Sequence, residues 1–114
     1  MIKASFEKVD NEFISMRVEG HAGQADKGKD IVCASASILA YTVAQTLTQM
    51  NKQGWLKKKP NLTLTEGNSL ITCRPKAEYF DECLMVFFVA EVGYNLLATN
   101  YPQYVGIELF GEAK

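Results

Sequence analysis

Two side chains that could perform nucleophilic chemistry lie near the start of the sequence. His21 is the only histidine in the chain, and Cys33 follows it in the stretch EGHAGQADKGKDIVCASAS. A thiolate is a nucleophile, and a neutral imidazole beside the thiol can take its proton and later return it to a leaving group. The pair indicates a catalytic site, half of a metal site, or a loop that runs into a helix.

Helix geometry would give Cys33 a reason to be reactive. We predict that Asp30 caps the amino terminus of a helix that ends near Gly54, which places Cys33 in the first turn. The free backbone N–H groups and the helix dipole favour a thiolate there, and the same N–H groups could hold an oxyanion. Asp30 has a second interpretation, as a carboxylate that orients His21.

The segment between the two side chains is predicted to be a loop. Residues 20–29 show no periodicity and contain three glycines, Gly20, Gly23 and Gly28. This loop would let His21, which follows a strand, fold back to the helix start. Ser37 lies one turn after Cys33, and Tyr41 narrows the same face. The remaining neighbours are small, which leaves room for a substrate chain: Ala34, Ala40 and Ala44.

The other cysteines do not suggest a second site. Cys73 belongs to an alternating strand and Cys83 to an apolar helix, so both are predicted to be core residues. Three cysteines form an odd set without a CxxC pair, so neither a disulfide framework nor a zinc ribbon is indicated. Two ligands do not complete a mononuclear metal site, so we expect no metal and no cofactor.

The hydrophobic pattern predicts strand, strand, helix, strand, strand, helix, strand. Alternating residues indicate one hairpin on either side of the VDNE turn, a second around EGNS, and a last strand at YVGIELF. Apolar residues at three- and four-residue spacing indicate the first helix. Residues 78–98 read as a second helix that is apolar on more than one face, which places it in the core centre or at an interface.

These elements predict one α+β domain over residues 1–114. A chain of 114 residues with 47% hydrophobic residues can bury a single core. The order of elements suits two layers, with both helices on one face of a mixed sheet of about five strands.

Charge and hydropathy narrow the class of partner. The net charge is −1, which argues against a protein that mainly binds nucleic acid. The only basic cluster is Lys57 to Lys59, which we interpret as a solvated connection, with an RNA contact as the alternative. We identify no signal peptide and no apolar run long enough to span a membrane, so a soluble, cytoplasmic protein is expected.

The combination of GHAG and GKDIVCASAS resembles the ribosomal-processing cysteine protease family, Prp, and the likeness extends over the whole chain. The resemblance implies an α+β fold, a homodimer, and an endopeptidase that removes the amino-terminal extension of large-subunit ribosomal protein number twenty-seven. It assigns Cys33 as the nucleophile, His21 as the base and Asp30 as a candidate helper. It implies that Gly20, Gly23 and Gly28 belong to a loop over the bound peptide. Ser37 is expected to face the substrate from its own position, one turn after Cys33.

Two other classes of function stay open from the residues alone. One is a non-enzymatic, ribosome-associated binding module that uses the same loop as a clamp. The other is a thiol hydrolase or acyltransferase that acts on another substrate. The labelling rate of the three cysteines separates the binding module from the enzyme, because a thiol beside a base reacts faster than a thiol in the core.

Overall fold

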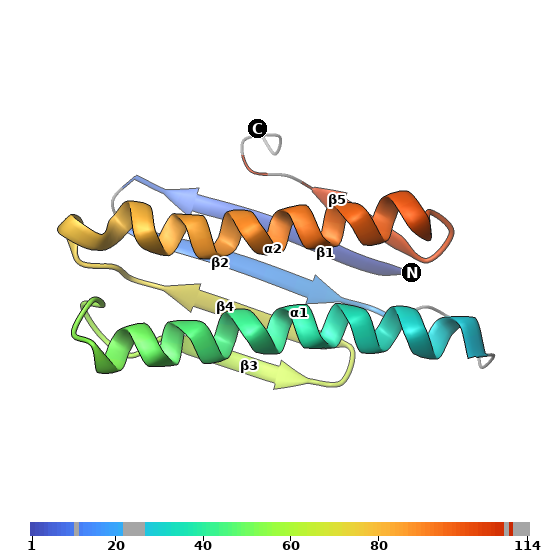
Figure 1. The fold of residues 1–114 in the computed structure, drawn as a ribbon, viewed down its shortest axis with the longest axis horizontal. Helices are drawn as coiled ribbons and strands as arrows, with labels where there is room; N and C mark the ends of the chain where they lie inside the picture. Colours follow the sequence, from blue (N-terminus) through green and yellow to red (C-terminus); the bar gives the residue numbers. More distant parts are fainter. Residues whose placement is uncertain (11, 22–26, 109, 111–114) are drawn as a thin grey trace.

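The computed structural model describes residues 1–10, 12–21, 27–108 and 110 (Figure 1). For residues 27–30 it describes the backbone only. The elements follow the predicted order, with one short 3₁₀ helix, η1, before the second long helix. They are β1 (Ile2–Val9), β2 (Phe13–Glu19), α1 (Lys27–Lys52), β3 (Asn61–Thr65), β4 (Asn68–Cys73), η1 (Ala77–Tyr79), α2 (Phe80–Asn100) and β5 (Val105–Glu108).

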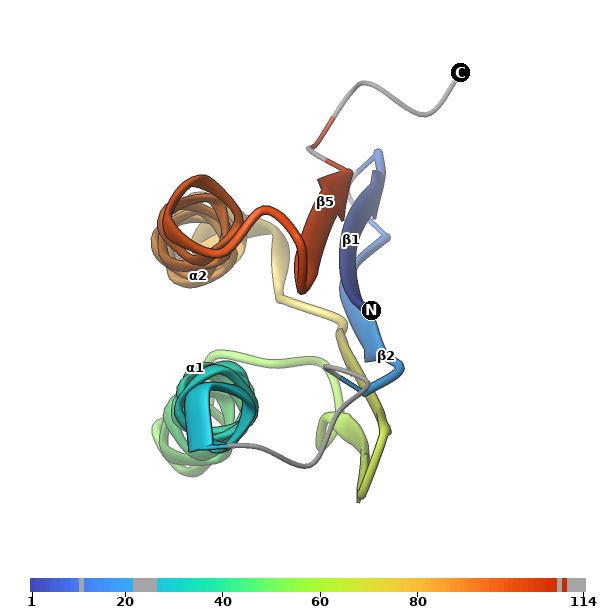
Figure 2. The same ribbon diagram turned by 90° about the vertical axis from the view of Figure 1, so that its right-hand side faces the viewer.

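The five strands form one mixed sheet in the order β3-β4-β2-β1-β5. Only β1 and β5 pair in parallel, and the other neighbours are antiparallel. Both helices cover the same face of this sheet (Figure 2). The predicted two-layer α+β architecture is therefore confirmed.

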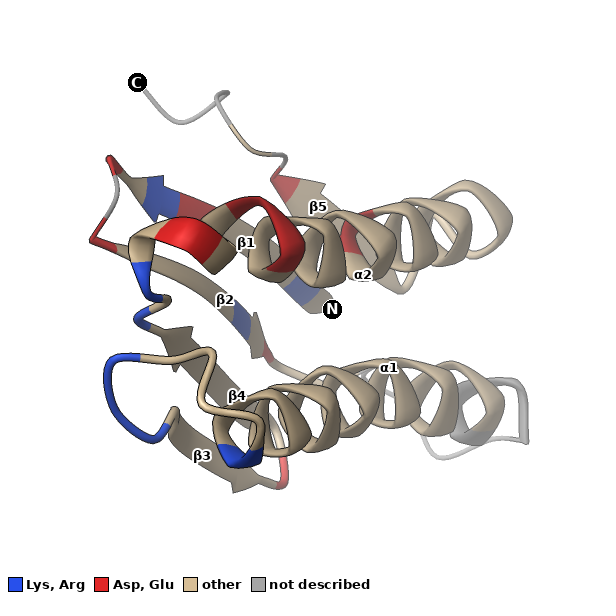
Figure 3. Ribbon diagram, turned by 60° about the vertical axis from the view of Figure 1, so that its left-hand side comes forward, with Lys and Arg blue, Asp and Glu red and all other residues tan. Residues whose placement is uncertain are grey.

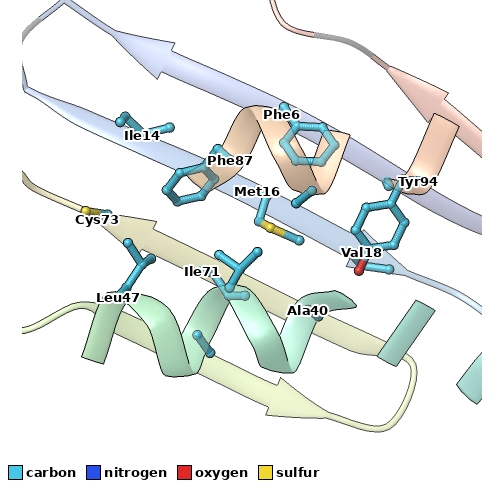
Figure 4. Close-up of a cluster of buried hydrophobic side chains, with 14 of the residues drawn as sticks. Phe6, Ile14, Met16, Val18, Ala40, Leu47, Ile71, Cys73, Phe87 and Tyr94 are labelled. Atoms are coloured by element: carbon cyan, nitrogen blue, oxygen red, sulfur yellow. The ribbon is translucent and has the colours of Figure 1, made fainter. Parts of the chain in front are cut away.

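The core lies between the helices and the inner face of the sheet (Figure 4). Ile14 and Met16 of β2 are 0% and 1% exposed, because alternate strand residues point to the same face. Leu47 of α1 and Phe87 of α2 meet that face, and neither is exposed to solvent. Burying an apolar side chain of this size contributes about 1.5–3 kcal/mol relative to exposing it, so this layer is what fixes the helices on the sheet.

The first helix begins earlier than predicted. It starts at Lys27, so Asp30 lies inside the helix and does not cap it. Gly28 also lies in the helix and not in the loop. The predicted start was wrong because Lys27, Gly28 and Lys29 have no apolar side chains and so give no periodic signal. The apolar residues that indicate the helix begin only after Asp30.

The carboxyl end of α1 has a glycine-dependent cap. Gly54 has a φ of +83°, its N–H donates to the Asn51 carbonyl, and the N–H of Trp55 donates to the Met50 carbonyl. These two bonds are those of a Schellman motif, in which glycine supplies the left-handed residue. They fix the direction in which the chain leaves α1 toward β3.

Both long helices are apolar enough to resemble membrane spans. Ile31–Lys52 and Ala77–Asn100 have mean hydropathies of 1.5 and 1.4, although polar residues interrupt the apolar runs of both helices. Length and composition alone do not separate a span from a core helix. Here each helix packs on an open sheet whose edge strands carry unpaired backbone groups, and such edges are not tolerated in hydrocarbon. The hydropathy therefore reflects two apolar faces, one of them packed on the sheet.

Candidate active site

The position of His21 is set by the end of β2. Gly20, which follows the last residue of β2, has a φ of +95°, and its N–H donates to the Gly67 carbonyl at 2.9 Å. A Cβ at Gly20 would collide with the Met1 carbonyl. Since only glycine fits this conformation and this space, the chain leaves the sheet in one direction, and His21 follows directly.

The His21 ring lies against the β3–β4 turn, formed by Glu66 and Gly67. Gly67 has a φ of +76°, and a Cβ built on it would stand 2.5 Å from His21 Nε2 and 2.7 Å from Cε1. The imidazole therefore occupies the space that any other residue at Gly67 would fill. Sequence reasoning recognised the turn in EGNS but not its contact with the histidine, which no local signal reveals.

One cavity of about 270 Å³ brings the predicted residues together. From α1 it is lined by Cys33 and Ser37, and from the opposite side by His21 and the β3–β4 turn. Tyr41 also lines it, as predicted. Ala40 and Ala44 instead pack in the core, with 1% and 4% of their surfaces exposed.

The helix-end explanation for the reactivity of Cys33 is wrong. Cys33 is the seventh residue of α1, in the second turn, because the helix begins at Lys27. Its backbone N–H lies within the helical hydrogen-bond ladder, which leaves only the first four N–H groups of a helix free. An oxyanion near Cys33 would need other donors, and Asn68 and Ser69 are polar residues that line the same cavity.

The three predicted loop glycines have different outcomes. Gly20 lies at the end of β2 and lines the cavity. Gly28 belongs to α1, as stated above, and Gly23 lies outside the described residues. For Asp30 the structure describes the backbone only, so its helper role stays a prediction.

The remaining thiols are core residues, as predicted. Cys73 and Cys83 are both 0% exposed, whereas Cys33 is half-buried at the cavity. A hydrogen bond with Cys83, together with burial, raises the pKa of the Cys73 thiol far above its ordinary value. Cys73 is therefore protonated at neutral pH, and Cys33 is the one cysteine at the cavity.

A buried tyrosine ties the two helices together behind the cavity. The Tyr94 hydroxyl of α2 donates to the Ala36 carbonyl of α1 at 2.7 Å. Ala36 lies one turn after Cys33 and lines the cavity. Burial raises the pKa of Tyr94, so the hydroxyl keeps its proton and this bond across the neutral range.

Among the residues that the structure describes, no three histidine, cysteine or acidic side chains form a group that could hold a metal ion.

Fold and cavity together define a small α+β protein in which a histidine and a cysteine line one cavity. The family model described as cysteine protease Prp matches residues 1–106, so the chain belongs to the cysteine protease Prp family. The resemblance seen in the sequence is thereby confirmed. No curated protein matches the chain by sequence.

Solved structures share the fold. A Streptococcus mutans protein has 23% identity and a TM-score of 0.68, covering 96% of this chain and 94% of its own. The ribosomal processing protease Prp from Staphylococcus aureus, in complex with a substrate peptide, has 17% identity and a TM-score of 0.69, covering 96% and 99%. The same protease with a covalently linked product peptide has 19% identity and a TM-score of 0.67, with the same coverage. At these identities the likeness establishes the fold.

Proposed function

We propose that this cysteine protease is an endopeptidase in which Cys33 is the nucleophile and His21 is the general base. The observation that carries the proposal is the shared cavity, which Cys33 enters from α1 and His21 from the end of β2. Cys33 is also the one thiol of the three that is not fully buried. A single histidine leaves no other imidazole in the chain to serve as the base.

The proposed reaction is acyl transfer in two steps. His21 takes the Cys33 proton, and the sulfur attacks the scissile carbonyl carbon to form a C–S bond. The C–N bond breaks as His21 returns the proton to the departing amine, which leaves a thioester on Cys33. His21 then removes a proton from water, which attacks the thioester and releases the carboxylate and the thiol.

We further propose that the substrate is the amino-terminal extension of large-subunit ribosomal protein number twenty-seven, cleaved in the cytoplasm. Membership in the Prp family supports this substrate. The S. aureus member of the same fold is described as a ribosomal processing protease bound to a peptide.

The direct test uses a synthetic peptide that spans the junction of the extension, with products identified by mass spectrometry. The Cys33→Ala variant should lose cleavage by at least about 10³-fold, because the residual rate without a nucleophile is far lower. The matched control is Ser35→Ala on the same helix, since Ser35 only donates to the Ile31 carbonyl and does not line the cavity. Cleavage by purified, folded Cys33→Ala would show the assignment to be wrong.

Thiol labelling separates the enzyme from a binding module. With iodoacetamide at neutral pH, Cys33 should react fast and Cys73 and Cys83 slowly in the folded protein. Three equally slow thiols would favour a non-enzymatic, ribosome-associated module. Fast labelling of Cys33 without peptide cleavage would favour a hydrolase or acyltransferase that acts on another substrate.

We also propose that the protein is a homodimer, joined through the outer helix face. This face consists of seven aliphatic, methionine and phenylalanine side chains on α1 and α2 that remain between 46% and 63% exposed: Ile31, Ile38, Met85, Phe88, Val89, Val92 and Leu96. Tyr41 of α1 is also exposed but lines the cavity, so it is not counted in this face. Between Ile31 and Asn51 the sequence contains no charged residue. The helices are correspondingly free of charge along most of their length (Figure 3).

The size of the outer helix face fits a dimer interface. Seven half-exposed large side chains present roughly 500–700 Å² of apolar surface, more than the roughly 300–600 Å² patch of an ordinary monomer. A standard interface buries roughly 800 Å² on each partner, so this face would supply most of the apolar area that such an interface needs. An apolar groove of about 260 Å³ between Thr42 on α1 and Val86 on α2 offers a place for side chains of the second copy.

A further inference from the structure

The end of the molecule remote from the cavity carries a cluster of cations around the end of α1 and the end of β4. Six of the 12 lysines and arginines lie there, in two segments that are distant in sequence, and we call this surface the cationic end: Lys52, Lys57, Lys58, Lys59, Arg74 and Lys76. Figure 3 shows these segments at the end of α1, in the loop that follows it, and at the link from β4 to α2. In the sequence, only the run Lys57 to Lys59 stands out as a basic cluster.

Backbone pairing holds the two segments side by side. Leu56 and Pro75 form an isolated β-bridge. The Lys57 N–H donates to the Arg74 carbonyl at 2.8 Å, and the Lys76 N–H donates to the Trp55 carbonyl at 3.0 Å. The cations are therefore brought together by a fixed backbone arrangement and not by a flexible loop.

Aromatic side chains reinforce this arrangement. The rings of Trp55 and Tyr79 stack with centroids 4.9 Å apart and an interplanar angle of 4°, which links the two segments a second time. The Arg74 guanidinium lies 5.1 Å from the centroid of the Phe13 ring, a cation–π contact that restrains its position. The positive charges thus sit on a rigid support, which lowers the entropy lost when an anion binds.

Charge on this surface is not neutralised locally. Among the described residues the one ion pair joins Arg17 and Glu19 on β2, away from the cationic end. Within residues 52–60 and 74–79 the only carboxylate is Glu78, with Asp81 and Glu82 following at the start of α2. Carboxylates also lie at this end of the molecule, at Asp10 and Glu12 of the β1–β2 turn and at Asp81 and Glu82 at the start of α2 (Figure 3). The cations around the end of α1 and the end of β4 are therefore separated from the carboxylates within one end of the molecule.

The surroundings favour a nucleic acid over a membrane. Residues 52–60 and 74–79 contain none of the exposed large hydrophobic side chains, whereas membrane-surface segments combine cations with apolar residues that insert. A groove of about 600 Å³ next to the lysines is lined by Lys59 and by the amide side chains of Asn51 and Asn61, together with Thr48, Thr63, Pro60 and the exposed Leu62. Amides beside lysines suit the hydrogen-bonding groups of sugars and bases next to a phosphate chain.

We propose that the cationic end binds the phosphate backbone of RNA, as a docking surface separate from the catalytic cavity. The separation follows from α1, which carries Cys33 near one end and Lys52 at the other. With a rise of 1.5 Å per residue, the two positions are roughly 28 Å apart. This surface departs from our expectation from net charge, because a net charge of −1 does not reveal a local cluster of six cations.

The test measures binding of the full chain to a fluorescent 20-nucleotide single-stranded RNA by anisotropy, at several salt concentrations. Replacement of Lys57, Lys58 and Lys59 by alanine should weaken binding at low salt at least tenfold. It should also lower the slope of log affinity against log salt by about 2, since each lost phosphate contact contributes about 0.7.

A matched triple variant removes the same charge elsewhere. Lys3→Ala, Lys8→Ala and Arg17→Ala neutralise three exposed cations of β1 and β2, outside the cationic end. This control should keep RNA affinity within about twofold. Both variants should keep peptide cleavage, so loss of RNA binding and failure of the proposed protease activity are read separately.

Three results would overturn the proposal. The wild-type chain could show no RNA binding at low salt, or the two triple variants could lose affinity equally, which would make the effect one of net charge. The third result is that another anion binds at the cationic end and RNA fails to displace it. Polyglutamate in this role would assign the surface to an acidic protein, and phosphatidylserine vesicles would assign it to a membrane. Melting curves of both variants check that each is folded.

Discussion

At the residue scale, Gly67 is the position on which the placement of His21 depends. Its carbonyl accepts the N–H of Gly20, and its missing side chain leaves space for the imidazole. The turn that holds Gly67 also lines the cavity. Gly67 therefore positions His21, the proposed base, in two ways. Its carbonyl holds the backbone of Gly20, and its missing side chain leaves space for the imidazole ring.

Gly67→Ala should displace the His21 ring and lower kcat by about 10²-fold, because a catalytic group moved by about 1 Å loses that much. The readout specific to this mechanism is the proton NMR signal of the imidazole, which is unambiguous because the chain has one histidine. In Gly67→Ala this signal should shift.

Gly54→Ala is the matched control for strain. Gly54 has a similar φ of +83°, but a Cβ there would meet only Lys76 Nζ, at 4.0 Å. Both alanines carry the cost of a left-handed backbone, roughly 1 kcal/mol. An unchanged His21 signal in Gly67→Ala, or an equal change in Gly54→Ala, would contradict the positioning role.

At the element scale, β4 and α2 bring two buried thiols together. Cys73 lies at the end of β4 and Cys83 in the first turns of α2, and their hydrogen bond raises the pKa of Cys73 and lowers that of Cys83. The lowered pKa of Cys83 adds stability only up to the ordinary thiol value, so above about pH 9 the raised pKa of Cys73 determines the direction. A thiol whose pKa is raised in the folded state stabilises the fold below its unfolded pKa. That stability decreases as pH rises, because the unfolded state loses its proton first.

The free energy of unfolding should therefore fall above about pH 9, the ordinary value for a thiol, by up to about 1.4 kcal/mol per pH unit. Urea unfolding at pH 8 and pH 10 measures the difference. The double variant Cys73→Ala/Cys83→Ala has no buried thiol and should lose less stability between these two pH values. Equal losses in both proteins would show that the thiol pair does not cause the alkaline sensitivity.

Local patterns were enough to predict the elements but not all of their boundaries. Alternation in β1 and β2 and the apolar stripe of α1 reported directly on burial, so the fold class was confirmed. The start of α1 was missed because Lys27 and Gly28 carry no apolar signal. The terminal strand was predicted, but its parallel pairing with β1 is a long-range choice that the sequence pattern does not contain.

The candidate site was predictable only in part, because local patterns do not reveal contacts between distant segments. His21 and Cys33 stood out by residue type, and both line the cavity. The contribution of Gly67 was not visible, because it depends on the register that pairs Glu19 of β2 with Asn68 of β4. That register places the residues after one strand beside the turn before the other, although they are far apart in sequence.

At the scale of the whole molecule, the two faces of the helical layer serve different purposes. The inner face packs on the sheet, with Ala90 and Phe87 of α2 3% and 0% exposed. The outer helix face keeps Val89 63% exposed. The apolar character on more than one face of this helix, noted in the sequence, is explained if the outer face pairs with a second copy.

Val89→Asp should convert the dimer to a monomer, because a carboxylate buried in an apolar interface costs several kcal/mol. Sedimentation velocity at tens of micromolar protein measures the change. Leu62→Asp is the control, since Leu62 is an exposed apolar residue of β3 and lies outside the outer helix face. A wild-type chain that sediments as a monomer, or a Val89→Asp variant that stays dimeric, would rule out this interface.

The length of α1 has a further consequence if RNA docks at one end and a peptide is cut at the other. Two weak attachments on one rigid body act together only when the ligand can reach both, and the second attachment then occurs at an effective concentration in the millimolar range. The molecule measures 44 Å along its longest axis. A scissile bond tethered within that reach of an RNA strand would be captured far more often than the same peptide free in solution. The length of α1 would then select substrates by the distance between their RNA anchor and the scissile bond, as well as by their sequence.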